Sequence, residues 1–142
     1  MILDLFRLDD QVAMVTHQGI GQAAAVALAE AGADIVAIDR SQPAETERTV
    51  TELGRRFFWL KTDLEKATVQ DLNERVAEAL RQAGRLDILV NNAGIIRRAM
   101  VLEHSEEDWD AVMQVNLKSL FFLSQAAARH FVAQKRGKII NI

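Results

Sequence analysis

The sequence contains no cysteine, no tyrosine and a single proline among its 142 residues. The absence of cysteine excludes a disulfide framework and a metal site built on thiolates. No apolar run is long enough to cross a bilayer, so no membrane partner is expected. The first residues, Met1–Arg7, carry an acid inside a short apolar run and have no small-residue cleavage site, which argues against a secretory signal. We therefore expect a cytoplasmic protein.

The chain also lacks a strong excess of one charge. Its 17 basic and 20 acidic side chains are mixed along the sequence and give a formal net charge of −3. Proteins that bind nucleic acid usually present a basic stripe to the phosphate backbone, and none is present here. The histidines His17, His104 and His130 share no metal-ligand spacing, so we expect them in loops or on the surface and predict no metal site. Nucleic acid is not an expected partner.

Short runs of branched apolar residues alternate with longer segments of helical periodicity. With 49% apolar residues, the chain can bury one core. This alternation predicts a doubly wound α/β fold around a parallel sheet, because each parallel return needs a crossover element. The last predicted strand ends the chain, and we expect one domain over residues 1–142 that is incomplete after its fifth strand. The predicted strands are Gln11–Val15, Asp34–Asp39, Arg56–Lys61, Leu86–Asn91 and Lys138–Ile142; the predicted helices are Gly21–Ala31, Ala44–Leu53, Val69–Gln82 and about 105–133.

Ligands of such sheets bind beyond the carboxyl ends of the strands. After the first strand, Gly19, Ile20 and Gly21 open a helix whose free amides favour an anionic group, although a tight turn can require the same glycines for steric reasons. Asp39 follows the second strand 20 positions after Gly19, the spacing at which an acid accepts ribose hydroxyls. Such a carboxylate repels a 2′-phosphate and favours NAD over NADP, while the neighbouring Arg40 could hold that phosphate.

The next two strand ends also carry polar and small residues. Asp63, followed by Leu64, could accept a hydrogen bond from an adenine amino group or could cap the next helix. The sequence Asn-Asn-Ala-Gly at 91–94 combines amides that can tie strands together with small residues that let a flat ring approach the backbone. The candidate cofactor contacts at these two ends are Asp63, Leu64, Asn91, Ala93 and Gly94.

Asn116 lies among apolar residues in the long predicted helix. A side-chain amide among apolar residues needs a hydrogen-bond partner, or it lies where a backbone carbonyl of the helix needs one. The alternative is that Asn116 faces solvent on the polar side of the helix. The segment Val115–Leu117, taken with Thr16, the Gly19–Gly21 turn, Asp63 and the Asn-Asn-Ala-Gly sequence, resembles the short-chain dehydrogenase/reductase family over the whole chain. Asn-Asn-Ala-Gly followed by Asn116 at this distance is more specific than the glycines.

The resemblance implies a Rossmann-like domain that binds NAD through Thr16 and the strand-end residues named above. Within the family the likeness is strongest to dehydrogenases of sugar acids, through the segments Gly94–Arg98, Glu107–Asp110, Phe121–Ala126 and Gly137–Ile142. It implies hydride transfer between NAD and a sugar acid, whose carboxylate Arg97 or Arg98 would attract. It also implies a homo-oligomer, a tetramer or dimer, with the helix around Asn116 packed against a partner subunit.

Two departures from the family pattern qualify this expectation. The family's catalytic serine and its tyrosine and lysine have no counterpart in the 142 residues, so Asn116, which would position a water in the proton relay, is the one catalytic residue carried over. The family has four residues between the threonine and the glycine pair, whereas His17 and Gln18 alone separate Thr16 from Gly19. We therefore expect no turnover from these residues alone. The alternatives are a non-catalytic remnant that binds nucleotide or partner subunits, and a flavodoxin-like module.

Overall fold

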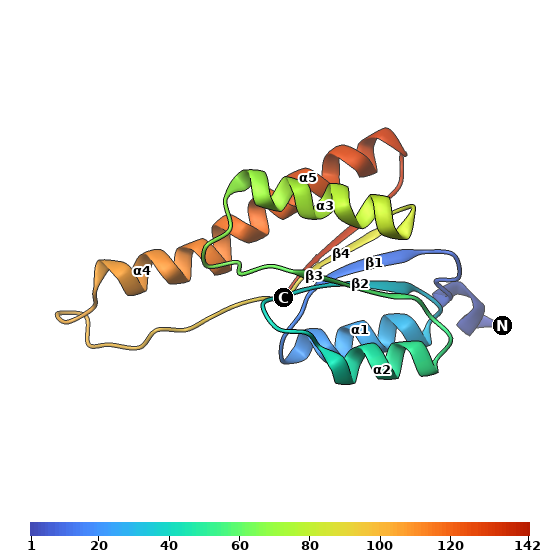
Figure 1. Cartoon of the computed structure of the whole chain (residues 1–142), viewed down its shortest axis with the longest axis horizontal. Helices are drawn as coiled ribbons and strands as arrows, with labels where there is room; N and C mark the ends of the chain where they lie inside the picture. Colours follow the sequence, from blue (N-terminus) through green and yellow to red (C-terminus); the bar gives the residue numbers. More distant parts are fainter.

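A computed structural model describes all 142 residues, and its centre is one parallel β-sheet (Figure 1). The sheet order is β3-β2-β1-β4-β5, so the direction of strand addition reverses between β1 and β4. All four strand pairings are parallel, which confirms the doubly wound α/β architecture. The strands are β1 (Val12–Thr16), β2 (Asp34–Asp39), β3 (Phe57–Lys61), β4 (Ile88–Asn91) and β5 (Lys138–Asn141), each within two residues of its predicted bounds.

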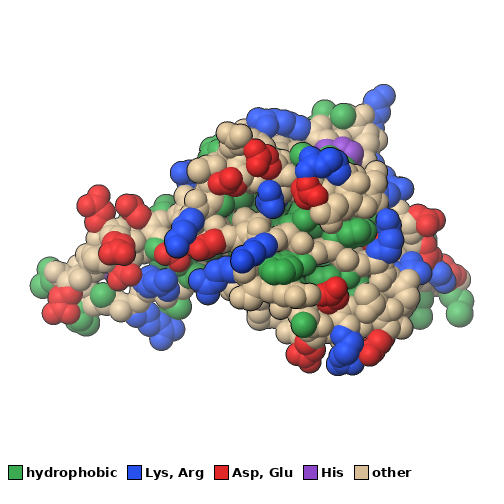
Figure 2. All heavy atoms as spheres, in the orientation of Figure 1, with side chains coloured by type: hydrophobic (Ala, Val, Ile, Leu, Met, Phe, Trp, Pro, Cys, Tyr) green, Lys and Arg blue, Asp and Glu red, His purple; other side chains and the backbone are tan.

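Helices cover both faces of the sheet. In Figure 1, α1 (Ile20–Glu30) and α2 (Ala44–Glu52) lie on one side, and α3 (Val69–Ala83) and α5 (Leu120–Ala133) lie on the other. A short 3₁₀ helix, η1 (Ile2–Phe6), precedes β1. No helix combines the length and apolar character that a membrane crossing requires. Charged side chains of both signs are mixed over the face shown in Figure 2, without a basic stripe.

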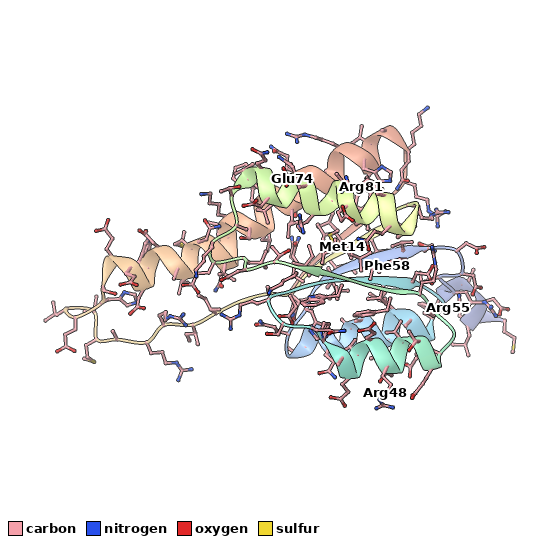
Figure 3. All side chains as sticks on the ribbon, viewed as in Figure 1. Met14, Arg48, Arg55, Phe58, Glu74 and Arg81 are labelled. Carbon is pink, nitrogen blue, oxygen red and sulfur yellow. The ribbon has the colours of Figure 1, made fainter.

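Alternate residues of β1 pack into two separate apolar cores, one on each face of the sheet. Val12 and Met14 belong to the larger cluster under α3 and α5, and Figure 3 labels Met14 at the sheet. Ala13 and Val15 belong to the smaller cluster, where alanines of α1 let that helix approach closely. Every residue of β1 is therefore buried, as expected for a central parallel strand covered on both faces.

The single long helix predicted over residues 105–133 is divided in the structure. It consists of α4 (Glu106–Met113), a π-helical turn η2 (Gln114–Ser119) and α5. The predicted start is correct, because the Ser105 hydroxyl accepts a hydrogen bond from the Asp108 amide at 3.1 Å. The prediction of one regular helix is wrong, since apolar periodicity continues through a π turn without marking it. Asn116 lies in this turn.

Asp87 joins β1 to β4 at the amino end of the sheet. Its buried carboxylate accepts a bond from the Val12 amide at 2.9 Å and two from the Arg85 guanidinium at 2.7 and 2.8 Å. Burial raises the pKa of this carboxyl, but the bonds from Arg85 and Val12 outweigh it and hold the pKa below its usual value. Asp87 is therefore a buried, fully partnered charge.

Candidate functional site

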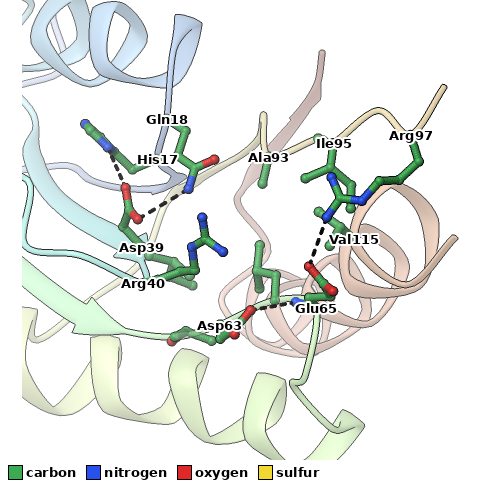
Figure 4. A pocket seen from close by; sticks show the side chains of 14 residues that line it. His17, Gln18, Asp39, Arg40, Asp63, Glu65, Ala93, Ile95, Arg97 and Val115 are labelled. Atoms are coloured by element: carbon green, nitrogen blue, oxygen red, sulfur yellow. Dashed lines mark hydrogen bonds and ion pairs between the residues drawn. The ribbon is translucent and has the colours of Figure 1, made fainter. Parts of the chain in front are cut away.

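A pocket lies at the carboxyl ends of the strands, next to the point where the strand order reverses (Figure 4). Its volume is about 120 Å³. Drug-sized ligands usually occupy about 300–1,000 Å³, so this pocket encloses only a part of a large ligand. The residues that line it end β2, follow β1, β2, β3 or β4, or lie on η2: His17, Gln18, Ile38, Asp39, Arg40, Thr62, Asp63, Leu64, Glu65, Ala93, Gly94, Ile95, Arg97 and Val115.

Five of the predicted site residues meet in this pocket: Asp39, Asp63, Leu64, Ala93 and Gly94. The other predicted residues lie around it without lining it: Thr16, Gly19, Ile20, Gly21, Asn91 and Asn116. The sequence missed the contributions of His17, Gln18, Glu65 and Ile95 to the lining. The glycine turn therefore contributes to the pocket mainly through its connection to the residues that line it.

Thr16 and Asn92 connect the glycine turn to the segment after β4. The Thr16 hydroxyl accepts hydrogen bonds from the Asn92 and Ala93 amides, both at 2.8 Å. The Asn92 side chain in turn donates to the carbonyls of Thr16 at 3.1 Å and Gln18 at 2.8 Å. A Cβ on Gly21 would lie 2.5 Å from the Asn92 side-chain nitrogen. Gly21 is thus required for this close approach.

The two remaining asparagines fix the same segment from its other side. Asn91 is buried and donates to Ser124 on α5 and to Asn141 on β5, both at 2.9 Å. Asn116 accepts from the Ile95 amide at 2.8 Å and donates to the Ile95 carbonyl at 2.9 Å. The amide of Asn116 therefore has the backbone partner that its apolar setting required. Both side chains hold the chain after β4 against α5 and η2.

Asp63 does not cap α3. That helix is capped by Thr68, whose hydroxyl accepts from the Asp71 amide at 3.1 Å. The Asp63 carboxylate instead accepts from the Glu65 amide at 3.1 Å and remains on the pocket lining. The capping interpretation of Asp63 is therefore wrong, and its contact with an adenine amino group stays a prediction.

His17 lies in the loop between β1 and α1, as expected, but it is buried rather than on the surface. Its side chain is 8% exposed and lies between the ends of β2 and α2. Nδ1 is 3.0 Å from Asp39 Oδ2, and Nε2 is 2.9 Å from the Thr46 hydroxyl. The shortness of the loop is the sequence signal that could have shown this, because His17 directly follows β1. The described residues contain no cluster that could hold a metal ion.

Gln18 adopts a strained backbone conformation, with φ at 129°. L residues with a side chain rarely adopt this region, at a cost of about 1–3 kcal/mol. We expect Gln18→Gly to raise the free energy of unfolding by about 1 kcal/mol, since glycine removes the strain but adds freedom to the unfolded chain. Urea denaturation measures this change. Gln22→Gly, in the helical backbone of α1, is the control. A higher unfolding free energy for Gln22→Gly, or a lower one for Gln18→Gly, would contradict the strain argument.

Arg97 lies at the pocket rim between two acids. Its guanidinium is 3.7 Å from a carboxylate oxygen of Glu65 and 3.6 Å from one of Asp108. Arg98 is exposed. Arg97 thus already has acidic partners on two segments, and Arg98 is the freer of the two arginines for a carboxylate from solution.

Residues 11–142 match the family described as short chain dehydrogenase. The chain belongs to the short-chain dehydrogenase family. A 2-dehydro-3-deoxy-D-gluconate 5-dehydrogenase of Escherichia coli is 53% identical to this short-chain dehydrogenase over 145 aligned residues, which cover 100% of the chain and 56% of the relative. The chain thus spans about half the length of the curated relatives it matches.

Two solved structures extend the comparison. A putative 2-deoxy-D-gluconate 3-dehydrogenase from Agrobacterium tumefaciens with bound NADP is 44% identical, with a TM-score of 0.82 and coverage of 96% of this chain and 54% of that one. A gluconate 5-dehydrogenase from Burkholderia cenocepacia in complex with NADP and tartrate is 41% identical, with a TM-score of 0.89 and coverage of 99% and 56%. This short-chain dehydrogenase shares the fold of both over nearly its whole length.

Proposed function

We propose that these residues form an NAD-binding domain, 1–142, of an oxidoreductase that transfers a hydride between NAD and a sugar acid. The observation that carries the proposal is the meeting of Asp39, Asp63 and the small residues Ala93 and Gly94 in one pocket at the strand ends. The Asp63 carboxylate can accept a bond from an adenine, Asp39 lies where the ribose is expected, and small residues leave space for a ring. NAD supplies the hydride chemistry.

The proposed substrate class comes from the relatives. Their names specify 2-dehydro-3-deoxy-D-gluconate, 2-deoxy-D-gluconate and gluconate, all of them sugar acids. We infer an activity like that of 2-deoxy-D-gluconate 3-dehydrogenase, with gluconate 5-dehydrogenase as the near neighbour. Arg98 would attract the substrate carboxylate, and Asn116, held on the Ile95 backbone, would position a water for proton transfer.

We also propose a homo-oligomer, tetramer or dimer, that pairs through α4, η2 and the start of α5. Trp109, Leu117 and Phe121 are 60%, 53% and 56% exposed, and together they form an apolar surface along one stretch of helix. A second copy of the chain would cover this surface.

A second candidate is a non-catalytic chain that binds nucleotide or partner subunits without turnover. The 142 residues contain no tyrosine, which the family resemblance implies as the proton donor and acceptor, so these residues alone would hold the cofactor without turnover. In this case the pocket would still bind the cofactor. Both candidates therefore predict cofactor binding. Hydride transfer by a longer chain that carries the tyrosine and lysine would favour the first candidate over the second.

Titration with NADH tests the proposal directly. The Trp59 indole donates to the Asp39 carbonyl at 3.1 Å, so its fluorescence reports on the end of β2. In a Trp109→Phe background, we expect saturable quenching of Trp59 below about 1 mM NADH, the usual upper range for enzyme ligands. A variant with Gly and three further residues in place of His17 and Gln18 tests the shortened loop in parallel. Absence of quenching in both chains would reject cofactor binding and favour a flavodoxin-like module.

A further inference from the structure

We propose that His17 determines cofactor specificity in this chain. By holding the Asp39 carboxylate against one wall of the pocket, His17 lets the pocket accept a 2′-phosphate on the adenosine ribose, with Arg40 as the partner of that phosphate. NADP then binds at least as well as NAD. This inference rests on the proposed function, because it concerns which form of the dinucleotide the same pocket admits.

The strand register places His17 beside Asp39. Thr16 pairs with Ile38 in the parallel ladder, and the next amide, that of His17, donates to the Ile38 carbonyl at 2.9 Å. With two residues between Thr16 and Gly19, the chain has no length to leave the sheet before His17. The imidazole therefore follows the end of β1 toward the end of β2. A loop of the usual family length would have additional residues in which to turn away.

Both oxygens of Asp39 have partners within the chain. Oδ2 is 3.0 Å from His17 Nδ1, while Oδ1 accepts from the Ser41 amide at 3.2 Å and from the Gln18 side chain at 3.5 Å. The Asp39 side chain is 9% exposed. In Figure 4 its carboxylate points toward His17 and Gln18. A 2′-phosphate in the pocket would consequently meet a carboxylate that is turned aside and engaged by donors.

Thr46 fixes the imidazole from the opposite side. Its hydroxyl is 2.9 Å from His17 Nε2, and its side chain is buried in the first turn of α2. A carboxylate only accepts hydrogen bonds, so we assign the Nδ1 proton to the bond with Asp39 and let Nε2 accept from the Thr46 hydroxyl. His17 is thereby locked between two elements and cannot release Asp39 by a simple change of rotamer.

Arg40 supplies the positive charge for the phosphate. It is exposed, lines the same pocket and has no ion pair, and in Figure 4 its guanidinium points into the pocket. A guanidinium can bind phosphate oxygens through two parallel hydrogen bonds. The other charged groups of the lining are Asp63 and the pair formed by Glu65 and Arg97 at 3.7 Å. Arg40 is thus the cation left for an incoming anion near Asp39.

Two fragments of the cofactors test the inference without the nicotinamide half. Calorimetric titration of the 142-residue chain with adenosine 2′,5′-bisphosphate and with AMP compares the phosphorylated and unphosphorylated ribose. We expect the bisphosphate to bind at least as tightly as AMP. Arg40→Gln should weaken the bisphosphate about tenfold or more and leave AMP unchanged, since a charge-assisted pair is lost. Arg48→Gln, a change on α2 at a residue paired with Glu52, is the control and should change neither affinity.

His17→Gly completes the test by freeing Asp39. We expect the affinity for the bisphosphate relative to AMP to fall about tenfold or more, as the carboxylate turns toward the ribose. Thermal melting checks that this variant folds. If His17→Gly does not fold, the affinities of Arg40→Gln for the two fragments decide whether the inference holds. Bisphosphate binding more than about tenfold weaker than AMP in the unmodified chain, equal behaviour of the two arginine variants, or no binding of either fragment would each overturn the inference. The NADH titration reports separately on the proposed function.

Discussion

Replacing Thr16 by valine is expected to lower the free energy of unfolding by about 3 kcal/mol. Valine keeps the shape of threonine but removes the hydroxyl that accepts from the Asn92 and Ala93 amides at 2.8 Å. Each amide left without an acceptor in a partly buried position costs about 1–3 kcal/mol. Urea denaturation followed by tryptophan fluorescence measures the loss.

Thr16→Ser is the matched control for this change. Serine keeps the oxygen and removes only a methyl group, so it should retain most of the stability. If valine and serine lower the unfolding free energy equally, the hydroxyl is not what connects the glycine turn to the segment after β4. We also expect the valine variant to bind NADH more weakly, because Ala93 lines the pocket.

Replacing Asp87 by alanine is expected to cost about 3 kcal/mol at neutral pH, since it removes the partner of a buried amide and of the Arg85 guanidinium. Asp87→Asn, which keeps an acceptor for the Val12 amide but not the charge, should cost less. The exposed Asp110 provides the control through Asp110→Asn, with an expected change within about 0.5 kcal/mol.

The effect of Asp87 should depend on pH in one direction. The pKa of Asp87 is lowered in the folded chain, so its ionised form stabilises the fold above the ordinary carboxyl pKa of about 3.9, and this stability is lost as the pH falls through the lower folded value. Urea denaturation at pH 7, 5 and 3 should therefore show that the difference in unfolding free energy between the original chain and Asp87→Asn becomes smaller as the pH falls. A difference that grows toward pH 3 would contradict the assigned bonds.

The fold was predictable because its signals are local. Each strand is a short apolar run, aromatic in β3 and rich in branched residues in the others, and each intervening helix carries its own periodicity, so the alternation alone indicates a parallel sheet. The pocket was predictable in part for a similar reason: Asp39 ends a strand, Asp63 lies two residues beyond one, and parallel strands end at one edge of the sheet. Their meeting needed no knowledge of packing.

What escaped prediction depends on contacts between distant segments. His17 is buried because Thr46, 29 positions later, and Asp39 surround it, and the short loop that it belongs to is the one local signal of this. In the π turn, the Asn116 side chain bonds to the Ile95 backbone 21 positions earlier, while the apolar pattern continues through the turn. The carbonyl of the strained Gln18 likewise accepts a bond from Asn92, 74 positions later.

Thr16 and Asp87 stand at opposite ends of the same β1–β4 pairing, and that pairing has a consequence for the order of folding. β1 can pair with β2 across a short stretch of chain. Its other edge pairs with β4, which is synthesised much later, since Asp87 comes 75 positions after Val12. Closing so long a loop is slow relative to local pairing. During synthesis, the first three strands can therefore assemble as a half-sheet whose open edge is β1, and the strand-end pocket comes into being only when β4 closes that edge.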